Sequence, residues 1–398
     1  MKRLLSIEDR NGVLTRMAEL LDQNRNELLA SNEKDLKSFD QSDLAMYDRL
    51  KVDENKIDGM MLSLEQLAGQ KDPVGVERFQ FEHANGLKIY NRTAAFGTVM
   101  IIYESRPDVT VEAAGIAFKS GNQILLKGGK ESLNSNLVIV GLWQRALNDK
   151  GVDSDWIQYL NLSRQQTQEF LKNPKQRIDL IIPRGGEKLI RFVKEHASCP
   201  VIVSGRGNNF AYVHEGAEVE EAYKIILNAK TAKISACNAL DKVLIDTRLI
   251  DLNDFVQVLV SRLVENGVEV YVGEDLKGVK NTIYRPEKDM WYEEFLDYKI
   301  RIGLVNSENE AMDMINTYGG GHSATIITTD QDTAMVFMEQ IDAAAVYHNA
   351  STRFTDGFEF GLGGELAIST DKLHQRGPIG LQHLVTNKWY VYGNGQIR

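Results

Sequence analysis

The chain has 398 residues but only two cysteines and seven prolines. Cys199 and Cys237 are widely spaced for a disulfide framework, and such sparse thiols are typical of a reducing compartment. Long apolar runs are also missing: TVMIIY (98–103) falls far short of the roughly 20 residues that a membrane crossing needs. Charges interrupt the N-terminal MKRLLSIEDRNGVL where a signal peptide has its apolar segment. We therefore expect a cytoplasmic protein without a membrane partner.

The sequence also lacks an excess of basic residues. Its formal net charge is −10, which argues against nucleic acid or anionic lipid as a partner. Anionic small molecules stay compatible with this charge, because local backbone N–H groups and a few cations outweigh distant, screened charge. Hydrophobic residues make up 43% and charged residues 26%, the balance of an ordinary globular protein. The length predicts two or more domains.

Two kinds of local pattern open the chain. Helical spacing of apolar residues over 1–72 predicts a helical layer with a solvated charged face. Alternating residues over 78–97, on either side of Asn85-Gly86, predict a β-hairpin. The tail KWYVYGNGQIR alternates in the same way and is expected to pair with that hairpin.

Strands then alternate with helices. TVMIIY, QILLK (123–127), IDLII (178–182) and CPVIVS (199–204) are expected strands, and a second alternating series follows residue 205. Such alternation predicts parallel sheets covered by helices on both faces, with ligands bound beyond the carboxyl ends of the strands. The loops ESRP and PRGG lie at such ends.

Several residues carry candidate chemistry, each with a plainer alternative. Cys237, in KISACNAL, is either an inert small hydrophobe or a nucleophile, whereas Cys199 fits the inert interpretation better. ILLKGGKES places two lysines where a dinucleotide would lie, or else forms a tight turn with solvated lysines. His322, in GGGHSATI, fits a plain loop. The glycine-rich stretch 349–369 suggests a binding surface.

Four stretches resemble the γ-glutamyl phosphate reductase (glutamate-5-semialdehyde dehydrogenase) branch of the aldehyde dehydrogenase superfamily. They are IIYESRPDVTVEAAGIAFKSGNQILLKGGKES, DLIIPRGGEKLI, CNAL and NASTRFTDGFEFGLGGELAISTDKLHQRGPIGL. The similarity runs in order over nearly the whole chain, and YESRP and STRFTDG…FGLG are specific to this branch.

The resemblance implies an α/β fold with two Rossmann-like parallel-sheet domains and a small β-hairpin element for oligomerisation. Residues 1–77 and 98–204, with part of 366–386, would form the NADP-binding domain. Residues 205–365 would form the catalytic domain. Residues 78–97 and 387–398 would form the oligomerisation element of a homodimer or homotetramer.

The resemblance also implies roles for residues at matching positions. Cys237 would be the nucleophile, and Ser105 would act with the Cys237 backbone N–H as an oxyanion hole. Five residues are implied to bind NADPH: Lys127 at the adenosine ribose, Lys130 near the 2′-phosphate, Gly185 and Gly186 beside the pyrophosphate, and Glu294 at the nicotinamide ribose.

The implied reaction is reduction of L-glutamyl 5-phosphate to glutamate 5-semialdehyde, the second step of proline biosynthesis from glutamate. A thiolate would displace phosphate to form a thioester, which NADPH would reduce. Oxidising relatives need a glutamate to activate water, and VIVSGRGNNF contains none, which favours the phosphate-releasing reductase. No metal is implied. The resemblance leaves open a functional coupling to a glutamate 5-kinase that hands over the unstable acyl phosphate.

Arg353, Ser351, Asn349 and His322 are predicted to grip the substrate's amino-acid end or its phosphate, since a carboxylate or phosphate suits a bidentate arginine. Two departures leave alternatives open. This chain has Asn209-Phe210 where the family usually shows Cys-His, and Lys233-Ile234 where it tends towards Arg-Pro. One alternative is an aldehyde dehydrogenase acting on another acyl phosphate or aldehyde. The other is an inactive oligomeric homologue.

Overall fold

The computed structural model describes residues 4–40 and 44–398, and the chain divides into two compact units. Unit 1 comprises Met1–Val203, Gly361–Ala367 and Ile379–Arg398, and unit 2 comprises Ser204–Phe360 and Ile368–Pro378. The predicted helical layer 1–72 extends over residues 1–3 and 41–43, which lie outside the described residues. The domain roles assigned from the sequence stay predictions.

A parallel sheet with the strand order β5-β4-β3-β6 forms the centre of unit 1. Its strands are β3 (Thr98–Tyr103), β4 (Gln123–Lys127), β5 (Ile157–Tyr159) and β6 (Leu180–Arg184). Successive side chains of a strand point to opposite faces. Val99 and Ile101 accordingly join one apolar cluster, and Met100 and Ile102 join another. The sheet is therefore buried on both faces, as the sequence predicted.

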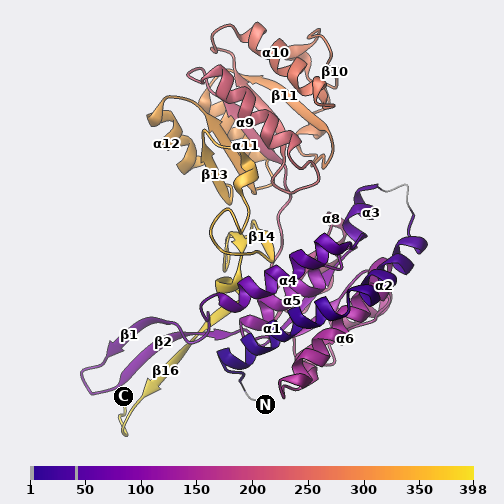
Figure 1. Cartoon of the computed structure of the whole chain (residues 1–398). Coiled ribbons are helices and arrows are strands. Elements are labelled where there is room, and N and C mark those ends of the chain that lie inside the picture. The colour runs from indigo at the N-terminus through magenta and orange to yellow at the C-terminus, as the bar shows by residue number, and fades with distance from the viewer. Residues whose placement is uncertain (1–3, 41–43) are drawn as a thin grey trace. The chain divides into compact units, whose positions relative to one another are not determined.

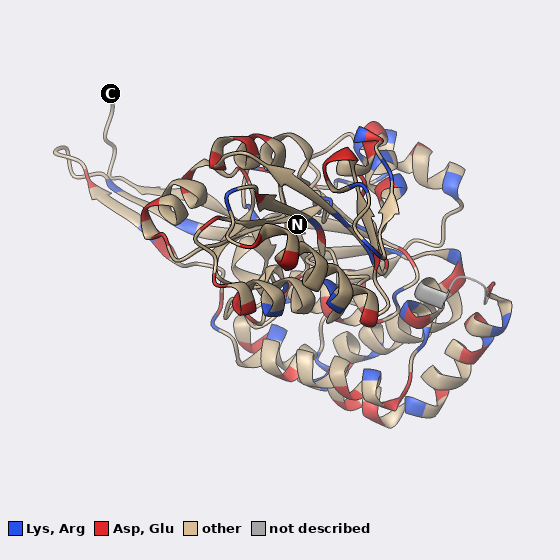
Figure 2. Cartoon of the chain, turned by 90° about the horizontal axis from the view of Figure 1, so that it is seen from above, with Lys and Arg blue, Asp and Glu red and all other residues tan. Residues whose placement is uncertain are grey.

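Helices cover these two faces. One face packs against residues of α1 (Ile7–Gln23), α2 (Arg25–Ser38), α4 (Glu54–Gly69), α5 (Val109–Lys119) and α6 (Leu133–Asp149). The other packs against α7 (Arg164–Lys172) and α8 (Glu187–His196). The short helix α3 (Leu44–Leu50) lies between α2 and α4 in the sequence. Along the helices of unit 1, Lys and Arg are interspersed with Asp and Glu, as expected for solvated faces (Figure 2).

Three antiparallel strands, β1 (Glu77–Glu82), β2 (Lys88–Ala95) and β16 (Val385–Tyr392), extend away from the helices of unit 1 (Figure 1). Gly86 adopts φ 88° in the β1–β2 connection, a left-handed conformation that favours glycine. β16 pairs with β2 along its whole length. Both the predicted hairpin and its pairing with the C-terminal tail are confirmed.

Unit 2 contains a parallel sheet with the order β10-β9-β11-β8-β7-β12-β13. The strands are β7 (Asn209–Val213), β8 (Leu240–Asp246), β9 (Glu269–Val272), β10 (Ile283–Tyr284), β11 (Lys299–Val305), β12 (Ser323–Ile327) and β13 (Ala345–His348). Helices α9 (Val219–Thr231) and α10 (Leu252–Glu265) pack on one face, and α11 (Glu308–Tyr318) and α12 (Gln331–Gln340) on the other. The predicted α/β fold class is confirmed.

The predicted strand CPVIVS is wrong as a regular strand. Val201 and Ser204 each form a single isolated bridge, to Ile181 and Ser369 respectively. Pro200 has no amide hydrogen to donate to a neighbouring strand, which limits pairing at this point. The remaining elements are β14 (Ala367–Ser369), β15 (Gly377–Ile379) and the 3₁₀ turns η1 (Lys130–Ser132), η2 (Ser154–Trp156), η3 (Glu274–Leu276), η4 (Lys288–Trp291), η5 (Thr352–Phe354) and η6 (Leu381–His383).

Over residues 4–40 and 44–398, none of the helices combines the length and the apolar character that spanning a bilayer requires.

Candidate active site

Cys237 lies in the loop between α9 and β8 of unit 2, and the side chain of Asn209 holds this loop. The fully buried amide nitrogen of Asn209 donates to the carbonyl oxygens of Cys237 (2.8 Å), Ala239 (2.7 Å) and Gly207 (2.9 Å). Its amide oxygen accepts from the backbone N–H of Ser323 at 3.0 Å. One side chain at the start of β7 therefore fixes the backbone on which the thiol is carried.

Gly207 connects the Cys237 loop to Glu294. A Cβ at position 207 would collide with the carbonyl of Cys237, so the two backbones approach as closely as glycine allows. The N–H of Gly207 donates to the carboxylate Oε1 of Glu294 at 2.8 Å. The structure thus brings Glu294 next to the loop that carries the predicted nucleophile.

Arg353 lies in η5, which is attached to the residue after Cys237. The amide of Asn238 donates to the carbonyls of Arg353 (3.1 Å) and Thr355 (3.0 Å), and the hydroxyl of Thr352 donates to the carbonyl of Asn238 (2.7 Å). Burial lowers the pKa of Arg353 below its usual value, and the negative charges of Cys237 and Asp356 oppose this shift. The guanidinium therefore lies within electrostatic reach of the thiol.

Two guanidinium nitrogens of Arg353, Nε and Nη1, are buried without a hydrogen-bond partner among the described residues. Buried donors are nearly always paired, and an unpaired one costs about 1–3 kcal/mol. A carboxylate or phosphate supplies the acceptor geometry that a guanidinium fits. Arg353 is therefore suited to hold an anionic ligand beside Cys237.

His322 lies at one end of a buried chain of hydrogen bonds. Its Nδ1 is 2.8 Å from the hydroxyl of Ser323, which is 2.7 Å from that of Thr355, which in turn is 2.6 Å from the hydroxyl of Tyr347. Burial lowers the pKa of His322 to about 4, so its imidazole is neutral near pH 7. The Nε2 atom is buried and has no partner among the described residues.

Ser351 and Asn349 are engaged with the backbone. The hydroxyl of Ser351 caps η5 by accepting from the N–H of Arg353 at 3.3 Å. Asn349 has a left-handed φ of 52°, and its amide both accepts from the N–H of Thr328 (2.9 Å) and donates to its carbonyl (2.8 Å). These contacts favour a structural role for both side chains, with Ser351 orienting the turn that carries Arg353.

The other predicted residues lie at the carboxyl edge of the unit 1 sheet. Lys127 ends β4, where burial lowers its pKa, an effect that Glu131 and Glu104 oppose. Gly185 and Gly186 are exposed in the turn between β6 and α8. Lys130 is exposed in η1.

Ser105, directly after β3, is fully buried with φ 41°. Its backbone N–H and hydroxyl both donate to Oε1 of Glu131 at 2.8 Å. Ser105 is therefore bonded to a carboxylate of its own unit in this structure. Its role in an oxyanion hole stays a prediction.

This edge fits the phosphates of a dinucleotide. The N–H of Gly186, at the first turn of α8, donates to Oε2 of Glu104 at 2.9 Å, so a carboxylate occupies the place that suits an anion. A Cβ on Gly185 would collide with that carboxylate, whereas a Cβ on Gly186 would only be in ordinary contact with it. The backbone of Gly185 therefore lies close to the Glu104 carboxylate, and Lys127 supplies a nearby cation.

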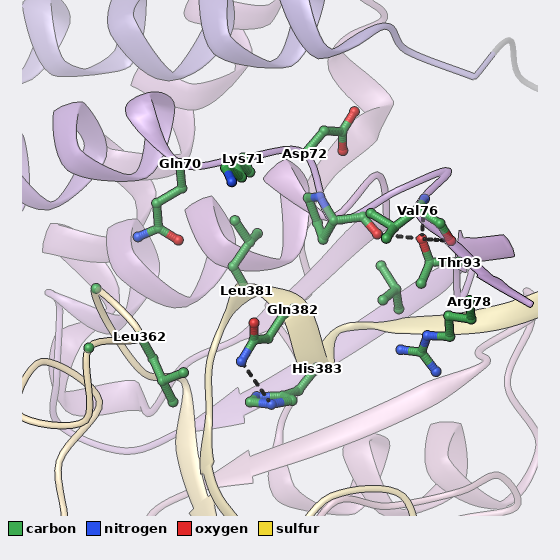
Figure 3. Close-up of a pocket in the computed structure, with 14 residues that line it drawn as sticks. Gln70, Lys71, Asp72, Val76, Arg78, Thr93, Leu362, Leu381, Gln382 and His383 are labelled. Atoms are coloured by element: carbon green, nitrogen blue, oxygen red, sulfur yellow. Dashed lines mark hydrogen bonds between the residues drawn. The ribbon is translucent and has the colours of Figure 1, made fainter.

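A separate cavity of about 580 Å³ lies within unit 1, near the start of β1. Gln70, Thr93, Leu381 and His383 line it, and the hydroxyl of Thr93 points to the backbone beside it (Figure 3). Its lining contains none of the site residues predicted from the sequence. The cavity is therefore distinct from the carboxyl edge of the sheet.

The two parallel-sheet units define an aldehyde-dehydrogenase-like protein, and comparison with known proteins agrees. Residues 2–280 and 284–389 match the aldehyde dehydrogenase family. Gamma-glutamyl phosphate reductase of Lachnospira eligens is 44% identical over 351 residues, which cover 88% of this chain and 84% of that protein. The enzyme of the same name from Dictyoglomus thermophilum is 43% identical over 352 residues, with the same coverage of both chains.

A solved structure agrees as well. The crystal structure of gamma-glutamyl phosphate reductase from Thermotoga maritima matches with a TM-score of 0.94 at 38% identity, over 100% of this chain and 96% of that one. An acetylating aldehyde dehydrogenase from Geobacillus thermoglucosidasius, 16% identical with a TM-score of 0.69 over 99% and 93% of the two chains, shares the fold. The chain belongs to the aldehyde dehydrogenase family of oxidoreductases and, within it, to the γ-glutamyl phosphate reductases.

The sequence alone does not reveal several residues of the site. Glu104 and Glu131 stand in the quoted motifs YESRP and KGGKES, but nothing in their spacing shows that they would bind Gly186 and Ser105. Asn209 stands out in the sequence only as a departure from the family pattern, and nothing there shows that it holds the Cys237 loop. These contacts join residues far apart in the sequence, so no local pattern reveals them.

Proposed function

We propose that the protein reduces L-glutamyl 5-phosphate to L-glutamate 5-semialdehyde with release of phosphate, the second step of proline biosynthesis from glutamate. NADPH is the proposed reductant, and Cys237 is the proposed nucleophile. The names of the relatives support the substrate, and the aldehyde dehydrogenase family uses a nicotinamide cofactor. The observation that carries the proposal is the pair of buried, unpartnered nitrogens of Arg353 beside Cys237.

In this mechanism Arg353 has two tasks. Its positive charge favours the ionised, nucleophilic form of the neighbouring sulfur. Its unpartnered donors hold the anionic substrate. The thiolate of Cys237 attacks the acyl carbon, the bond from that carbon to the phosphate oxygen breaks, and phosphate leaves with the electron pair. A thioester remains on Cys237.

When bound, the cofactor would supply a hydride to the thioester carbon. Breakage of the C–S bond would then return the sulfur of Cys237 as a thiolate and release the aldehyde. The rest is done by the protein. Asn209 and Gly207 hold the Cys237 loop against Glu294, and the proposed roles of Lys127, Lys130, Gly185 and Gly186 are to bind the dinucleotide. VIVSGRGNNF contains no glutamate to activate water, which leaves phosphate as the acceptor in the reverse direction.

The test is the reverse reaction: oxidation of glutamate 5-semialdehyde by NADP⁺ in the presence and absence of phosphate. We expect wild-type turnover only with phosphate. Cys237→Ala should abolish turnover but bind NADPH as before. Cys199→Ala is the matched control, because burial, with Asp179, raises the pKa of that thiol and should leave it inert. Activity in Cys237→Ala, or activity independent of phosphate, contradicts the proposal.

Arg353 offers a second arm of the test. Arg353→Met removes the charge and the donors, and we expect kcat/KM to fall roughly 100-fold, the scale of a lost charge-assisted hydrogen bond. Arg353→Lys keeps the positive charge but loses the paired donors of the guanidinium, so its kcat/KM should lie between those of Arg353→Met and the wild type. Unchanged kinetics in Arg353→Met would remove the observation on which the proposal rests.

Homo-oligomerisation through β1, β2 and β16 is also proposed. This small sheet exposes several large apolar side chains: Phe79, Phe81, Trp389, Val391 and Tyr392. Exposed apolar strands next to an open edge favour association between copies. Light scattering should give a dimer or tetramer for the wild type and a smaller species for Phe81→Asp. A wild-type monomer at micromolar concentration contradicts this. Kinase coupling and a cytoplasmic location stay predictions.

A further inference from the structure

The N-terminal turn of α5 gathers ionisable side chains that the mechanism above does not use. Asp108 and Glu112 are neighbours on one face of this turn, since the N–H of Glu112 donates to the carbonyl of Asp108 at 3.0 Å. Arg106 belongs to the same segment, Arg184 ends β6, and Lys56 belongs to α4. All five lie in unit 1, and the segment follows β3 at the carboxyl edge of the sheet, where parallel sheets bind ligands.

One carboxylate oxygen of Asp108 lacks a hydrogen-bond donor. Its carboxylate is buried, with 7% of the residue exposed, and Oδ2 accepts from Nη2 of Arg106 at 3.0 Å. Oδ1 is buried and has no hydrogen-bond partner among the described residues. A buried carboxylate oxygen without a donor is unfavourable, so this atom points to a ligand that donates a hydrogen bond.

Glu112 adds a second carboxyl group at the same place. Burial and the charge of Asp108 raise the pKa of Glu112 to about 7, although Arg106, Arg184 and Lys56 oppose this shift. Asp108, which burial alone would shift upwards, has its pKa lowered by Arg106 and Lys56. The two carboxyls therefore differ in charge near pH 7, and a cation placed between them would allow both to ionise.

The head group of an α-amino acid, with its ammonium and carboxylate on one carbon, matches the two carboxyls and the arginine of this turn. An ammonium group brings three N–H donors for the unpartnered Oδ1 of Asp108 and for the carboxyl of Glu112, and the carboxylate attached to the same carbon suits a guanidinium. The side chain of Arg106 is 41% exposed, so a ligand can reach it. We propose that Asp108 and Glu112 bind the α-ammonium group of the substrate and that Arg106 binds its α-carboxylate. This inference rests on the proposed function, which supplies an α-amino acid as substrate.

The test compares three aldehydes in the phosphate-dependent oxidation by NADP⁺. Glutamate 5-semialdehyde carries both head-group charges, glutarate semialdehyde lacks the ammonium, and butanal lacks both. In Glu112→Gln and Asp108→Asn, kcat/KM for glutamate 5-semialdehyde should fall roughly 10- to 100-fold, mostly through KM, because a charge-assisted hydrogen bond is lost. Values for the other two aldehydes should change less than twofold. Arg106→Met should impair both carboxylate-bearing aldehydes and spare butanal.

Controls separate binding from folding. Glu65→Gln removes an exposed carboxylate from α4 and should leave all three aldehydes unaffected. Asp108 is buried, so Asp108→Asn risks a folding defect, whereas Glu112 is only partly buried and gives the cleaner variant. Melting temperatures of both variants accompany the kinetics. Equal losses for all three aldehydes, or no loss for any, overturn the head-group site.

A pH profile gives a readout that a merely structural role would not move. Ammonium binding favours the ionised form of Glu112, so binding releases a proton when the pH is below about 7. The ratio of kcat/KM for glutamate 5-semialdehyde to that for glutarate semialdehyde should therefore fall as the pH decreases from 8 to 6. In Glu112→Gln this ratio should be flat. A ratio that falls equally in the variant overturns the proposal.

The same measurements distinguish a wrong substrate from a wrong head-group site. If wild-type protein oxidises butanal but not glutamate 5-semialdehyde, the proposed substrate is wrong and the head-group site falls with it. If wild-type protein requires phosphate and oxidises glutamate 5-semialdehyde, but Glu112→Gln does not discriminate among the aldehydes, the proposed function stands and the head-group site alone is wrong.

Discussion

Replacing Asn209 by alanine tests how the Cys237 loop is held. The wild-type amide has two N–H donors, which it directs at three carbonyl oxygens, those of Gly207, Cys237 and Ala239. It also accepts one bond from the N–H of Ser323. Alanine removes all of these contacts at a position with 0% exposure, where water cannot easily replace them.

The expected loss can be estimated from these bonds. Two donated hydrogen bonds and one accepted bond, at about 1 kcal/mol each, give about 3 kcal/mol of stability. For a unit of 150–250 residues, 1 kcal/mol corresponds to about 2–4 °C in the melting temperature, so unit 2 should melt about 6–12 °C lower. Asn209→Asp keeps the shape but places a carboxylate against three carbonyl oxygens, so it should be more destabilising than Asn209→Ala.

Differential scanning calorimetry of the whole chain measures this effect. Asn266→Ala is the matched control, because the exposed amide of Asn266 makes one bond, to the carbonyl of Arg262 at 2.8 Å. Its melting temperature should change by no more than about 2–4 °C. A shift below 2 °C in Asn209→Ala, or an Asn209→Asp protein as stable as Asn209→Ala, would refute the reasoning.

Three further predictions follow from single contacts. Gly207→Ala adds a Cβ against the Cys237 carbonyl, so turnover should fall at least 100-fold, with a smaller loss of NADPH affinity in a fluorescence titration because the N–H of Gly207 holds Glu294. The pKa of His322 is about 6.5 in the unfolded chain and about 4 in the folded one. At pH values between these two, His322 is protonated in the unfolded chain but neutral in the folded protein. Stability is therefore lost as the pH falls through this range, and His322→Gln should lose about 2 kcal/mol less than the wild type from pH 7 to pH 5 in urea unfolding. Glu104→Gln removes a negative charge from the N–H of Gly186, so the Kd for NADPH should decrease about two- to fivefold.

The fold was predictable where its causes are local. The predicted strands TVMIIY and QILLK coincide with β3 and β4 at both ends. A short apolar run between turn residues is typical of a strand that is buried on both faces. CPVIVS failed because an apolar run does not show whether a neighbouring strand offers pairing partners.

The site was predictable only in part. The sequence named Cys237 and Arg353, and the structure places η5 against the Cys237 loop through Asn238 and Thr352. The sequence could not show that the side-chain amide of Asn349 is hydrogen-bonded to the backbone of Thr328, because that contact depends on the pairing of β12 with β13. Motifs identify which residues are present, whereas pairing across strands determines which polar atoms stay available to a ligand.

Two carboxylates of unit 1 occupy backbone donors that an anionic ligand would use. Glu104 and Glu131 accept from the N–H groups of Gly186 and Ser105, the kind of donor that a phosphate or an oxyanion would use. A ligand anion that binds the N–H of Gly186 must displace Glu104 from it. Because Glu104, Ser105 and Arg106 are consecutive, such a displacement acts on the backbone that leads directly into Asp108. Cofactor affinity and head-group recognition are therefore expected to depend on one short segment, residues 104–108. A substitution there should change the affinities for both ligands, whereas a substitution at Lys130 should change only the affinity for the cofactor.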